Sequence, residues 1–318
     1  MRISYSAISS YQKCPLAYRF QYVDRLPTAP SPALSFGQSL HEALRWFYDV
    51  QTADPYSLEE LVDRLETCWV SDGYSSPEEE TRYFLQARSA LGLFYRNLVD
   101  FRIPAALENR FLIDLGFCSL SGVIDRLDKD PEGGFEIIDY KTNRRLPPAR
   151  RLYEDLQLPI YHVAVEKIWE VSPAKVTFHY LLLNHRHSMS ITPERVEEAL
   201  VQIRNVVDYI DGEAFEPVKN PLCPWCDFIE MCPVWEGKVI PRKTTASPAL
   251  EIGEAVDEIL LTEKIVSQAL ARIEGLKGVI ASYLSDQGVD RVGGSRGIAF
   301  IDENGFLTWR EGDFRSLE

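Results

Sequence analysis

Two groups of residues in this sequence have the types and the spacing that chemistry requires. In the middle of the chain, Asp125 is followed by Asp139 and Lys141. Paired carboxylates with a lysine beside them are typical of a metal-dependent phosphodiesterase site, because carboxylate oxygens bind hard divalent cations. The second group sets Cys14 against a Cys-x2-Cys-x5-Cys run that begins at Cys223, and four thiolates are typical of a metal clamp.

The predicted local structure brings the two acids together. Residues 117–127 and 135–140 are rich in Ile, Phe, Val and Leu and are separated by a Pro-Gly turn sequence, which predicts a β-hairpin. Asp125 and Asp139 lie near the ends of these strands, so both carboxylates can reach one edge of the sheet and bind Mg2+ or Mn2+. The Lys141 side chain then shares a face with Asp139, while Tyr140 points away and offers only its carbonyl.

Lys141 in that position can orient an attacking water, help to deprotonate it and stabilise charge on phosphoryl oxygens. An Asp-x-Lys triplet alone is also typical of a surface hairpin with alternating charges. Gly37-x3-His41 lies on a predicted helix, where the imidazole could complete a metal shell or be structural. Gln157 and Tyr161 share one face of another predicted helix and could hold a phosphate or a base, although Tyr161 could equally be core.

Hydrophobic periodicity predicts an α/β (α+β) fold. Helical periodicity covers residues 6–22, 36–50, 58–70, 77–100, 153–169 and 193–210. Strand patterns cover residues 107–115, 117–127, 135–140 and 175–183. Together they predict a mixed central sheet flanked by helices, with a helical N-terminal region.

The sequence changes character after residue 240. Residues 220–233 are a loop rich in cysteine and proline, and residues 242–248 are typical of a linker. A long helix is predicted over 252–284, followed by a hairpin over 290–309 that turns at Asp302-Glu-Asn-Gly305. We therefore expect a principal domain over residues 1–240 and a C-terminal extension over residues 241–318.

Composition restricts the class of protein. The chain has 318 residues, of which 45% are hydrophobic, and this suffices for a substantial core. Without a membrane-length apolar run or a signal peptide pattern, we expect a cytoplasmic protein with no membrane contact. A formal net charge of -14 argues against a protein that coats nucleic acid non-specifically. One basic cluster is a candidate for phosphate contact, although such runs are commonly solvated: Arg144, Arg145, Arg150 and Arg151.

The six cysteines favour metal binding over disulfides, because a reducing compartment keeps thiols free. Four thiolates suit a structural zinc ion as well as an iron–sulfur cluster. Cys14 lies far from the other three, unlike the paired local knuckles of most zinc ribbons, and this favours the cluster. Cys68 and Cys118 have no motif around them and are predicted to be buried small hydrophobes.

Taken together, these residues resemble a known family. Four motifs are similar, in order, to those of the RecB-like branch of the PD-(D/E)XK nucleases: Gly37-x3-His41, Gly122-x2-Asp125-Arg126, Asp139-x-Lys141 and Gln157-x3-Tyr161. The segments from Ser4 to Cys14 and from Cys223 to Pro233 resemble the iron–sulfur version found in AddB-type nuclease domains and CRISPR adaptation nucleases. The resemblance covers residues 3–235 and leaves the C-terminal extension unexplained.

The resemblance implies a restriction-endonuclease-like fold and a metal-dependent deoxyribonuclease, expected to be an exonuclease. The Mg2+ or Mn2+ ion would be held by His41, Asp125, Asp139 and the carbonyl of Tyr140. Lys141 would be the catalytic lysine, and Gln157 and Tyr161 would support the site or engage the strand. Glu108 occupies the preceding strand, where such nucleases often carry an acid. The ligands of a [4Fe-4S] cluster, with zinc as the alternative, would be Cys14, Cys223, Cys226 and Cys232.

The expected partner is DNA, single-stranded or with free ends, in DNA repair, recombination, or CRISPR or phage DNA processing. A helicase or a CRISPR adaptation protein would be a further partner, since the chain has no phosphate-binding loop of its own. One alternative is a catalytically inactive DNA-binding or scaffold subunit stabilised by a four-cysteine metal site, which the intact Asp125, Asp139 and Lys141 set disfavours. Another is a zinc-stabilised interaction module.

Overall fold

The structure is a computed structural model that describes residues 1–50, 54–98, 101–129, 134–238, 248–294, 297–302 and 305–311. Two compact units divide the chain, one over Met1–Arg242 and the other over Lys243–Glu318. None of the helices in the described ranges combines the length and the apolar character that crossing a membrane would take.

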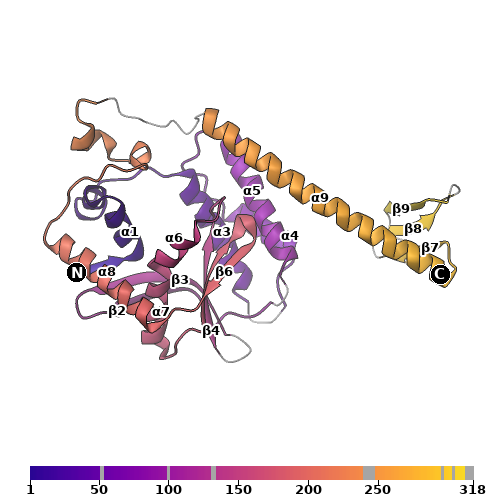
Figure 1. Ribbon diagram of the computed structural model, residues 1–318, viewed down its shortest axis with the longest axis horizontal. Coiled ribbons are helices and arrows are strands. Elements are labelled where there is room, and N and C mark those ends of the chain that lie inside the picture. The colour runs from indigo at the N-terminus through magenta and orange to yellow at the C-terminus, as the bar shows by residue number, and fades with distance from the viewer. Residues whose placement is uncertain are drawn as a thin grey trace. The chain divides into compact units, whose positions relative to one another are not determined.

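The first unit alternates helices with a six-stranded sheet (Figure 1). Its strands are β1 (Arg2–Ser4), β2 (Ala106–Asp114), β3 (Ser119–Lys129), β4 (Phe135–Lys141), β5 (Lys175–Tyr180) and β6 (His185–Met189). Its α-helices are α1 (Tyr5–Lys13), α2 (Pro15–Tyr18), α3 (Pro32–Tyr48), α4 (Leu58–Thr67), α5 (Pro77–Arg96), α6 (Ala149–Glu154), α7 (Gln157–Trp169) and α8 (Pro193–Asp211). The shorter helical turns are η1 (Arg19–Val23), η2 (Leu181–Leu183), η3 (Cys223–Trp225), η4 (Ile229–Met231) and η5 (Pro233–Trp235).

Most of the long helices begin at a side-chain cap. Ser31, Ser57, Ser76 and Thr192 each accept a hydrogen bond from a backbone N–H in the first turn of α3, α4, α5 and α8. These caps satisfy N–H groups that have no partner inside the helix. Local sequence therefore determines where these helices begin.

The sheet is mixed, as predicted. Strand β3 pairs antiparallel with β2 along one edge. Its other edge pairs with β1 in parallel through Ser121 and with β4 antiparallel from Arg126 onward. Strand β4 continues into a parallel pair with β5, which pairs antiparallel with β6. Among these ladders, the stretch of β3 between Ser121 and Arg126 has no strand beside it on the β1 and β4 edge.

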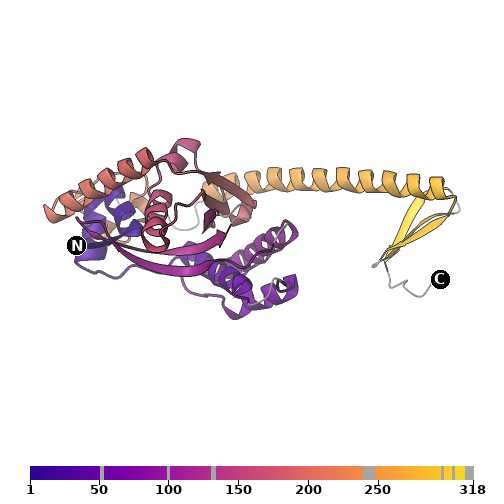
Figure 2. The ribbon, with the colours of Figure 1, turned by 90° about the horizontal axis from the view of Figure 1, so that it is seen from below.

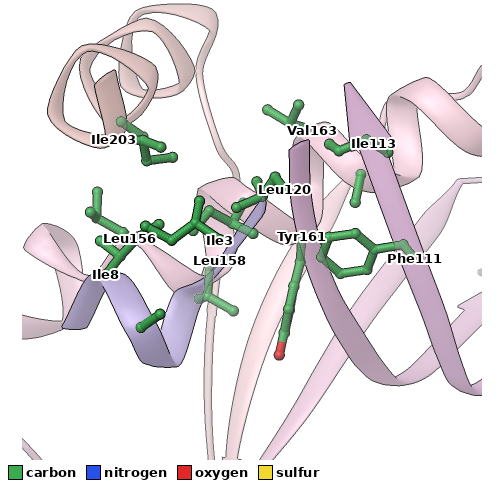
Figure 3. Close-up of a cluster of buried hydrophobic side chains, with 14 of the residues drawn as sticks. Ile3, Ile8, Phe111, Ile113, Leu120, Leu156, Leu158, Tyr161, Val163 and Ile203 are labelled. Atoms are coloured by element: carbon green, nitrogen blue, oxygen red, sulfur yellow. The ribbon is translucent and has the colours of Figure 1, made fainter. Parts of the chain in front are cut away.

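Helices lie on both faces of this sheet (Figures 1 and 2), and a hydrophobic core fills the space on each face. One core joins the sheet to α1, α7 and α8, and Figure 3 shows part of it. The other joins the sheet to α3, α4 and α5. Strand β4 alternates between them, because Ile137 belongs to the first core while Ile138 and Tyr140 belong to the second. This alternation assigns Asp139 and Lys141 to the α7 face.

Two predicted helices are interrupted. The helix predicted over 6–22 breaks at Cys14, whose backbone is extended with φ -161° and ψ 109°. Pro15 disfavours a helical conformation at the residue before it, which explains the break. The helix predicted over 153–169 breaks at Asp155, which is extended and separates α6 from α7. Both breaks place a functional candidate, Cys14 or Gln157, at a helix boundary.

Two strands, β1 and β6, were not predicted from the sequence pattern. Strand β1 has only three residues, too few for a period to be visible. The strand predicted over 175–183 ends at Tyr180, and the chain turns through η2 into β6. Asn184 makes this turn with φ 44°, a left-handed conformation that asparagine tolerates better than most residues.

The second unit contains α9 (Pro248–Gln287) and a three-stranded antiparallel sheet at the C-terminal end of that helix (Figure 1). Its strands are β7 (Arg291–Gly294), β8 (Gly297–Ile301) and β9 (Leu307–Glu311). The predicted long helix is therefore present, and the predicted hairpin corresponds to the antiparallel pair β8–β9; the additional strand β7, which pairs with β8, was not predicted. Residues 242–247 of the predicted linker, residues 130–133 of the Pro-Gly turn, and Glu303 and Asn304 of the hairpin turn lie outside the described residues.

A buried histidine within the sheet should make the free energy of unfolding depend on pH. His179 of β5 is 6% exposed, and burial lowers its pKa to about 4. In the unfolded chain His179 binds a proton below a pH of about 6.5, whereas in the folded chain it stays neutral down to about pH 4. The free energy of unfolding therefore decreases as pH falls from about 6.5 to about 4. Between pH 7 and pH 5 the free energy of unfolding, measured with urea, should fall by about 1–3 kcal/mol less in His179→Gln than in the parent. The exposed His185→Gln variant should behave as the parent does.

Candidate functional site

The split between β1 and β4 creates the candidate site. Asp125 is the last residue of β3 before the β4 ladder begins at Arg126. Its Oδ2 accepts a hydrogen bond of 2.8 Å from the backbone N–H of Tyr140, so the side chain bridges the two strands where they diverge. Asp125 is 9% exposed and Asp139, beside Tyr140, is 2% exposed. The hairpin thus brings both acids to one place, as the sequence predicts.

Helix α3 supplies the imidazole. His41 Nδ1 lies 3.4 Å from Oδ2 of Asp125, and His41 Nε2 lies 3.1 Å from the carbonyl oxygen of Tyr140. Gly37, one turn earlier on α3, lies beside Thr142 just beyond β4, and a Cβ at this position would make an ordinary contact of 3.6 Å with the Thr142 hydroxyl. His41 therefore contacts both of the other predicted metal ligands, Asp125 and the carbonyl of Tyr140.

The tightest potential ligand group includes an acid that the sequence indicated only weakly. Ligand atoms of His41, Glu108 and Asp125 all lie within 4.8 Å of one another. Glu108 is on β2, directly opposite Asp125, because its neighbours Leu107 and Asn109 pair with Arg126 and Ile124. Its backbone has φ 44°, a left-handed conformation that is costly for a glutamate inside a strand. Such strain is common where a strand aims a side chain into a functional site.

Asp139 lies outside that group and is held by a different network. Lys141 Nζ lies 2.6 Å from Oδ2 of Asp139 and donates a hydrogen bond of 2.5 Å to Oε1 of Gln157. Gln157 Nε2 donates to Oδ1 of Asp139 and to the hydroxyl of Tyr161, both at 2.8 Å. Within the described residues, Asp139 Oδ2 accepts no hydrogen bond of good geometry, although it is buried. The four side chains meet where the start of α7 lies beside the end of β4.

Charge in this site is unbalanced toward the negative. Burial raises the pKa of Asp139, and although Lys141 opposes this, Asp125 adds to it and the pKa reaches about 6. Burial, followed by Asp125, also raises the pKa of Glu108. Burial lowers the pKa of His41, but Asp125, Asp139 and Glu108 more than offset this and raise it to about 9. The donor set of carboxylates, imidazole and carbonyl therefore fits a hard divalent cation.

The predicted arginine cluster begins just beyond β4. Arg144 donates to Oε1 of Gln86 at 3.3 Å and lies over the ring of Tyr83, so it rests against α5. Arg150 pairs with Glu154 one turn along α6 at 2.6 Å and is exposed. The remaining two side chains, those of Arg145 and Arg151, are also exposed. The cluster is on the surface, and its role in DNA binding stays a prediction.

The four cysteines of the predicted clamp line one cavity of about 310 Å³. Cys14 lies between α1 and α2, and the other three lie on or beside η3, η4 and η5. The backbone N–H of Val218 lies 3.5 Å from Sγ of Cys14, and that of Asn220 lies 3.4 Å from Sγ of Cys223. The side-chain amide of Asn220 also donates to the carbonyl of Lys13 at 2.9 Å, which ties the C-terminal loop to the end of α1.

The thiols in this cavity lie close enough to affect one another electrostatically. Burial raises the pKa of Cys226, and nearby Cys14, Cys223 and Cys232 add to the increase. A cation would relieve this by binding the thiolates. Outside the clamp, Cys118 is buried as predicted, whereas Cys68 is only half-buried, and its thiol lies 3.6 Å from the carbonyl of Ser39.

Similar proteins were found by sequence and by structure. One subunit of an ATP-dependent helicase/deoxyribonuclease from Streptococcus uberis is 25% identical over 57% of this chain, which spans only 18% of the length of that relative. The Gene 69 protein of Mycobacterium phage D29 is 24% identical over 73% of this chain and 97% of its own. A crystal structure of a candidate exonuclease from Eubacterium rectale has a TM-score of 0.47 and 14% identity, covering 77% of this chain and 91% of its own.

The family itself is established by a match over most of the chain. The sequence profile described as the PD-(D/E)XK nuclease superfamily matches residues 2–233. These residues include both acids, the lysine, His41 and the cysteine run. The chain belongs to the PD-(D/E)XK nuclease superfamily.

Proposed function

We propose that this protein is a Mg2+- or Mn2+-dependent deoxyribonuclease that hydrolyses phosphodiester bonds, and that it acts as an exonuclease. The observation that carries the proposal is the meeting of His41, Glu108 and Asp125 within 4.8 Å, at the strand split that also carries Asp139 and Lys141. Membership of the nuclease superfamily supports the same conclusion.

His41, Asp125, Asp139 and the carbonyl of Tyr140 would hold the divalent cation, with Glu108 as a further ligand. When bound, a divalent cation polarises the phosphoryl oxygens and lowers the pKa of water, which makes a nucleophile available near neutral pH. The proton on His41 has to leave before its imidazole can bind a cation, so binding should release protons. Asp125 and Glu108 provide the negative charge that makes this exchange favourable.

Lys141 provides a fixed positive charge on the α7 face of the same site. Its ammonium group is directed by Asp139 and by Oε1 of Gln157, so it keeps one orientation when DNA arrives. From there it can hold an attacking water by hydrogen bonding and stabilise negative charge on the phosphate during displacement. Gln157 and Tyr161 keep Lys141 and Asp139 in register, and this is the role that we propose for them.

The cysteine cavity would hold a [4Fe-4S] cluster that fastens α1 to the C-terminal end of the nuclease unit. All four thiols line the same cavity, which lies between the end of α1 and the η3–η5 loop. The backbone N–H groups directed at Cys14 and Cys223 support a cluster, because hydrogen bonds to the sulfurs are a feature of iron–sulfur sites.

The substrate would be DNA that is single-stranded or has free ends, with the exposed arginines after β4 guiding the strand. Similarity to part of a helicase/deoxyribonuclease supports a helicase as a partner, and the CRISPR adaptation proteins are the other candidates. Arg145, Arg150 and Arg151 can neutralise phosphates at low cost because their side chains are on the surface.

The direct test is cleavage of end-labelled single- and double-stranded DNA by anaerobically purified protein, with Mn2+, with Mg2+ and with EDTA. Metal-dependent products that shorten one nucleotide at a time would support an exonuclease, and internal fragments would indicate an endonuclease. A protein that binds DNA and metal but cleaves neither form would be the inactive DNA-binding alternative instead.

Glu108 gives a separate test of the metal site. Glu108→Gln removes a charged oxygen ligand while preserving shape, and we expect Mn2+ affinity to fall about 10- to 100-fold, since partners of a metal shell commonly contribute this much. The rise in melting temperature that Mn2+ causes should shrink accordingly, because only the folded state binds the ion. Calorimetry and thermal unfolding can measure both. The matched Glu154→Gln variant loses an exposed acid of α6 and should keep the parent's Mn2+ response.

A further inference from the structure

The N-terminal segment reaches the candidate active site through one hydrogen bond. Tyr5 is the first residue of α1, and its hydroxyl donates to Oδ2 of Asp155 at 2.9 Å. Asp155 stands at the break between α6 and α7, and its other oxygen, Oδ1, accepts a hydrogen bond of 2.7 Å from the backbone N–H of Gln157. One carboxylate therefore joins the start of α1 to the first residue of α7.

The position of Gln157 matters because its side-chain amide makes hydrogen bonds to three residues of the site. The amide oxygen accepts from Lys141, and the amide nitrogen donates to Asp139 and to Tyr161. A shift of the Gln157 backbone must break or lengthen at least one of these bonds. Because such networks polarise one another in a low-dielectric site, losing one bond weakens the rest.

The backbone of Asp155 is anchored independently of Tyr5. Arg195 of α8 is 5% exposed and donates to the carbonyl oxygens of Tyr153 at 3.1 Å and Asp155 at 3.2 Å. With the Asp155 backbone held by Arg195, the Tyr5 hydroxyl and the Gln157 backbone N–H share the Asp155 carboxylate, one on each oxygen. Burial, then the charges of Asp155 and Asp139, raise the pKa of Tyr5, so the hydroxyl keeps the proton that it donates.

We propose that the Tyr5–Asp155 pair is a positioning element of the nuclease site, which orients Lys141 through Gln157 and makes that orientation depend on α1. The inference rests on the proposed nuclease function. Ile8 of α1 and Leu156 and Leu158 at the start of α7 belong to one buried cluster, so α1 packs against this junction (Figure 3). The same helix ends at Cys14, which lines the cysteine cavity. Tyr5 thus connects the cysteine clamp to the catalytic face of the sheet.

The test compares two tyrosine variants of the same helix in the full-length protein. Tyr5→Phe removes only the hydroxyl, and we expect kcat for DNA cleavage to fall about 10- to 100-fold with KM and Mn2+ affinity unchanged. Tyr11→Phe is the matched control, because it removes a hydrogen bond of 2.6 Å from α1 to the carbonyl of Ala214, away from the site. Both variants should lose similar thermal stability, but Tyr11→Phe should keep the parent's kcat.

A second measurement does not require activity. The side-chain amide resonance of Gln157, assigned with a Gln157→Glu variant, should shift in Tyr5→Phe and stay in place in Tyr11→Phe. The positioning role would be overturned if the chemical shift of the Gln157 amide were unchanged in Tyr5→Phe, or if both variants lost the same fraction of kcat. If the parent protein cleaves no DNA but the resonance shifts as expected, the proposed nuclease function fails while the positioning of Gln157 by Tyr5 stands.

Discussion

Replacing Lys141 with methionine should lower DNA cleavage by about 100- to 10,000-fold, the range that a positioned proton-transfer and charge-stabilising group commonly contributes. Methionine keeps the length of the side chain and its packing over the ring of Phe178, which the lysine ammonium approaches to 4.8 Å. The fold should persist, because Gln157 still donates to Asp139. Mn2+ affinity should change little, since Lys141 supplies no ligand atom.

Two further variants distinguish the loss of the Lys141 charge from the loss of metal binding. Asp125→Asn should lose both cleavage and Mn2+ affinity, although its side-chain oxygen can still accept the hydrogen bond from Tyr140. Lys167→Met removes an exposed lysine near the end of α7 and should cleave as the parent does. Rates from single-turnover assays with saturating Mn2+, together with titration calorimetry, give both quantities. Equal cleavage by Lys141→Met and the parent would refute the role assigned to this lysine.

The sequence was sufficient where periodicity and sterics act locally. Asp139 and Lys141 share a face because a strand alternates every second residue, and both contact Gln157, which the resemblance implied would support the site or engage the strand. The mixed sheet and its flanking helices follow from the same patterns. The helix breaks at Cys14 and Asp155 could not be predicted from these patterns, although the proline after Cys14 was a signal for the first break. The break at Asp155 depends on a hydrogen bond to Gln157 that hydrophobic periodicity does not reveal.

Glu108 shows why part of the site could not be predicted. In β2, Leu107 packs against the α3 side while Phe111 is in the α7 core, although both are odd-numbered. In β3, Ile124 and Leu127 both belong to the α7 core, although they are three residues apart. Both strands therefore change their alternation at Glu108 and Asp125, which lie opposite each other. A rule of strict alternation cannot place a ligand at the point where the alternation fails.

The cysteine cavity leads to the second large prediction. Cys226→Ala should abolish the iron content and the visible absorbance of anaerobically purified protein, because four ligands are required to hold the cluster. It should also lower the free energy of unfolding by on the order of 4–5 kcal/mol, since the clamp closes a loop of about two hundred residues between Cys14 and Cys223 and so restricts the unfolded chain. Metal analysis, absorbance and urea unfolding measure these effects.

The control for this variant is Cys68→Ala, which removes a half-buried thiol outside the cavity and should keep both iron and absorbance. A colourless parent protein that contains zinc would overturn the cluster assignment and leave the nuclease site untouched, because the two sites share no ligand. Loss of iron without loss of stability would contradict the clamp instead. Because α1 joins Cys14 to Tyr5, Cys226→Ala should also lower kcat beyond what the population of folded protein explains. Cleavage measured at temperatures where the variant remains folded therefore distinguishes a clamp that only stabilises from one that also positions the site.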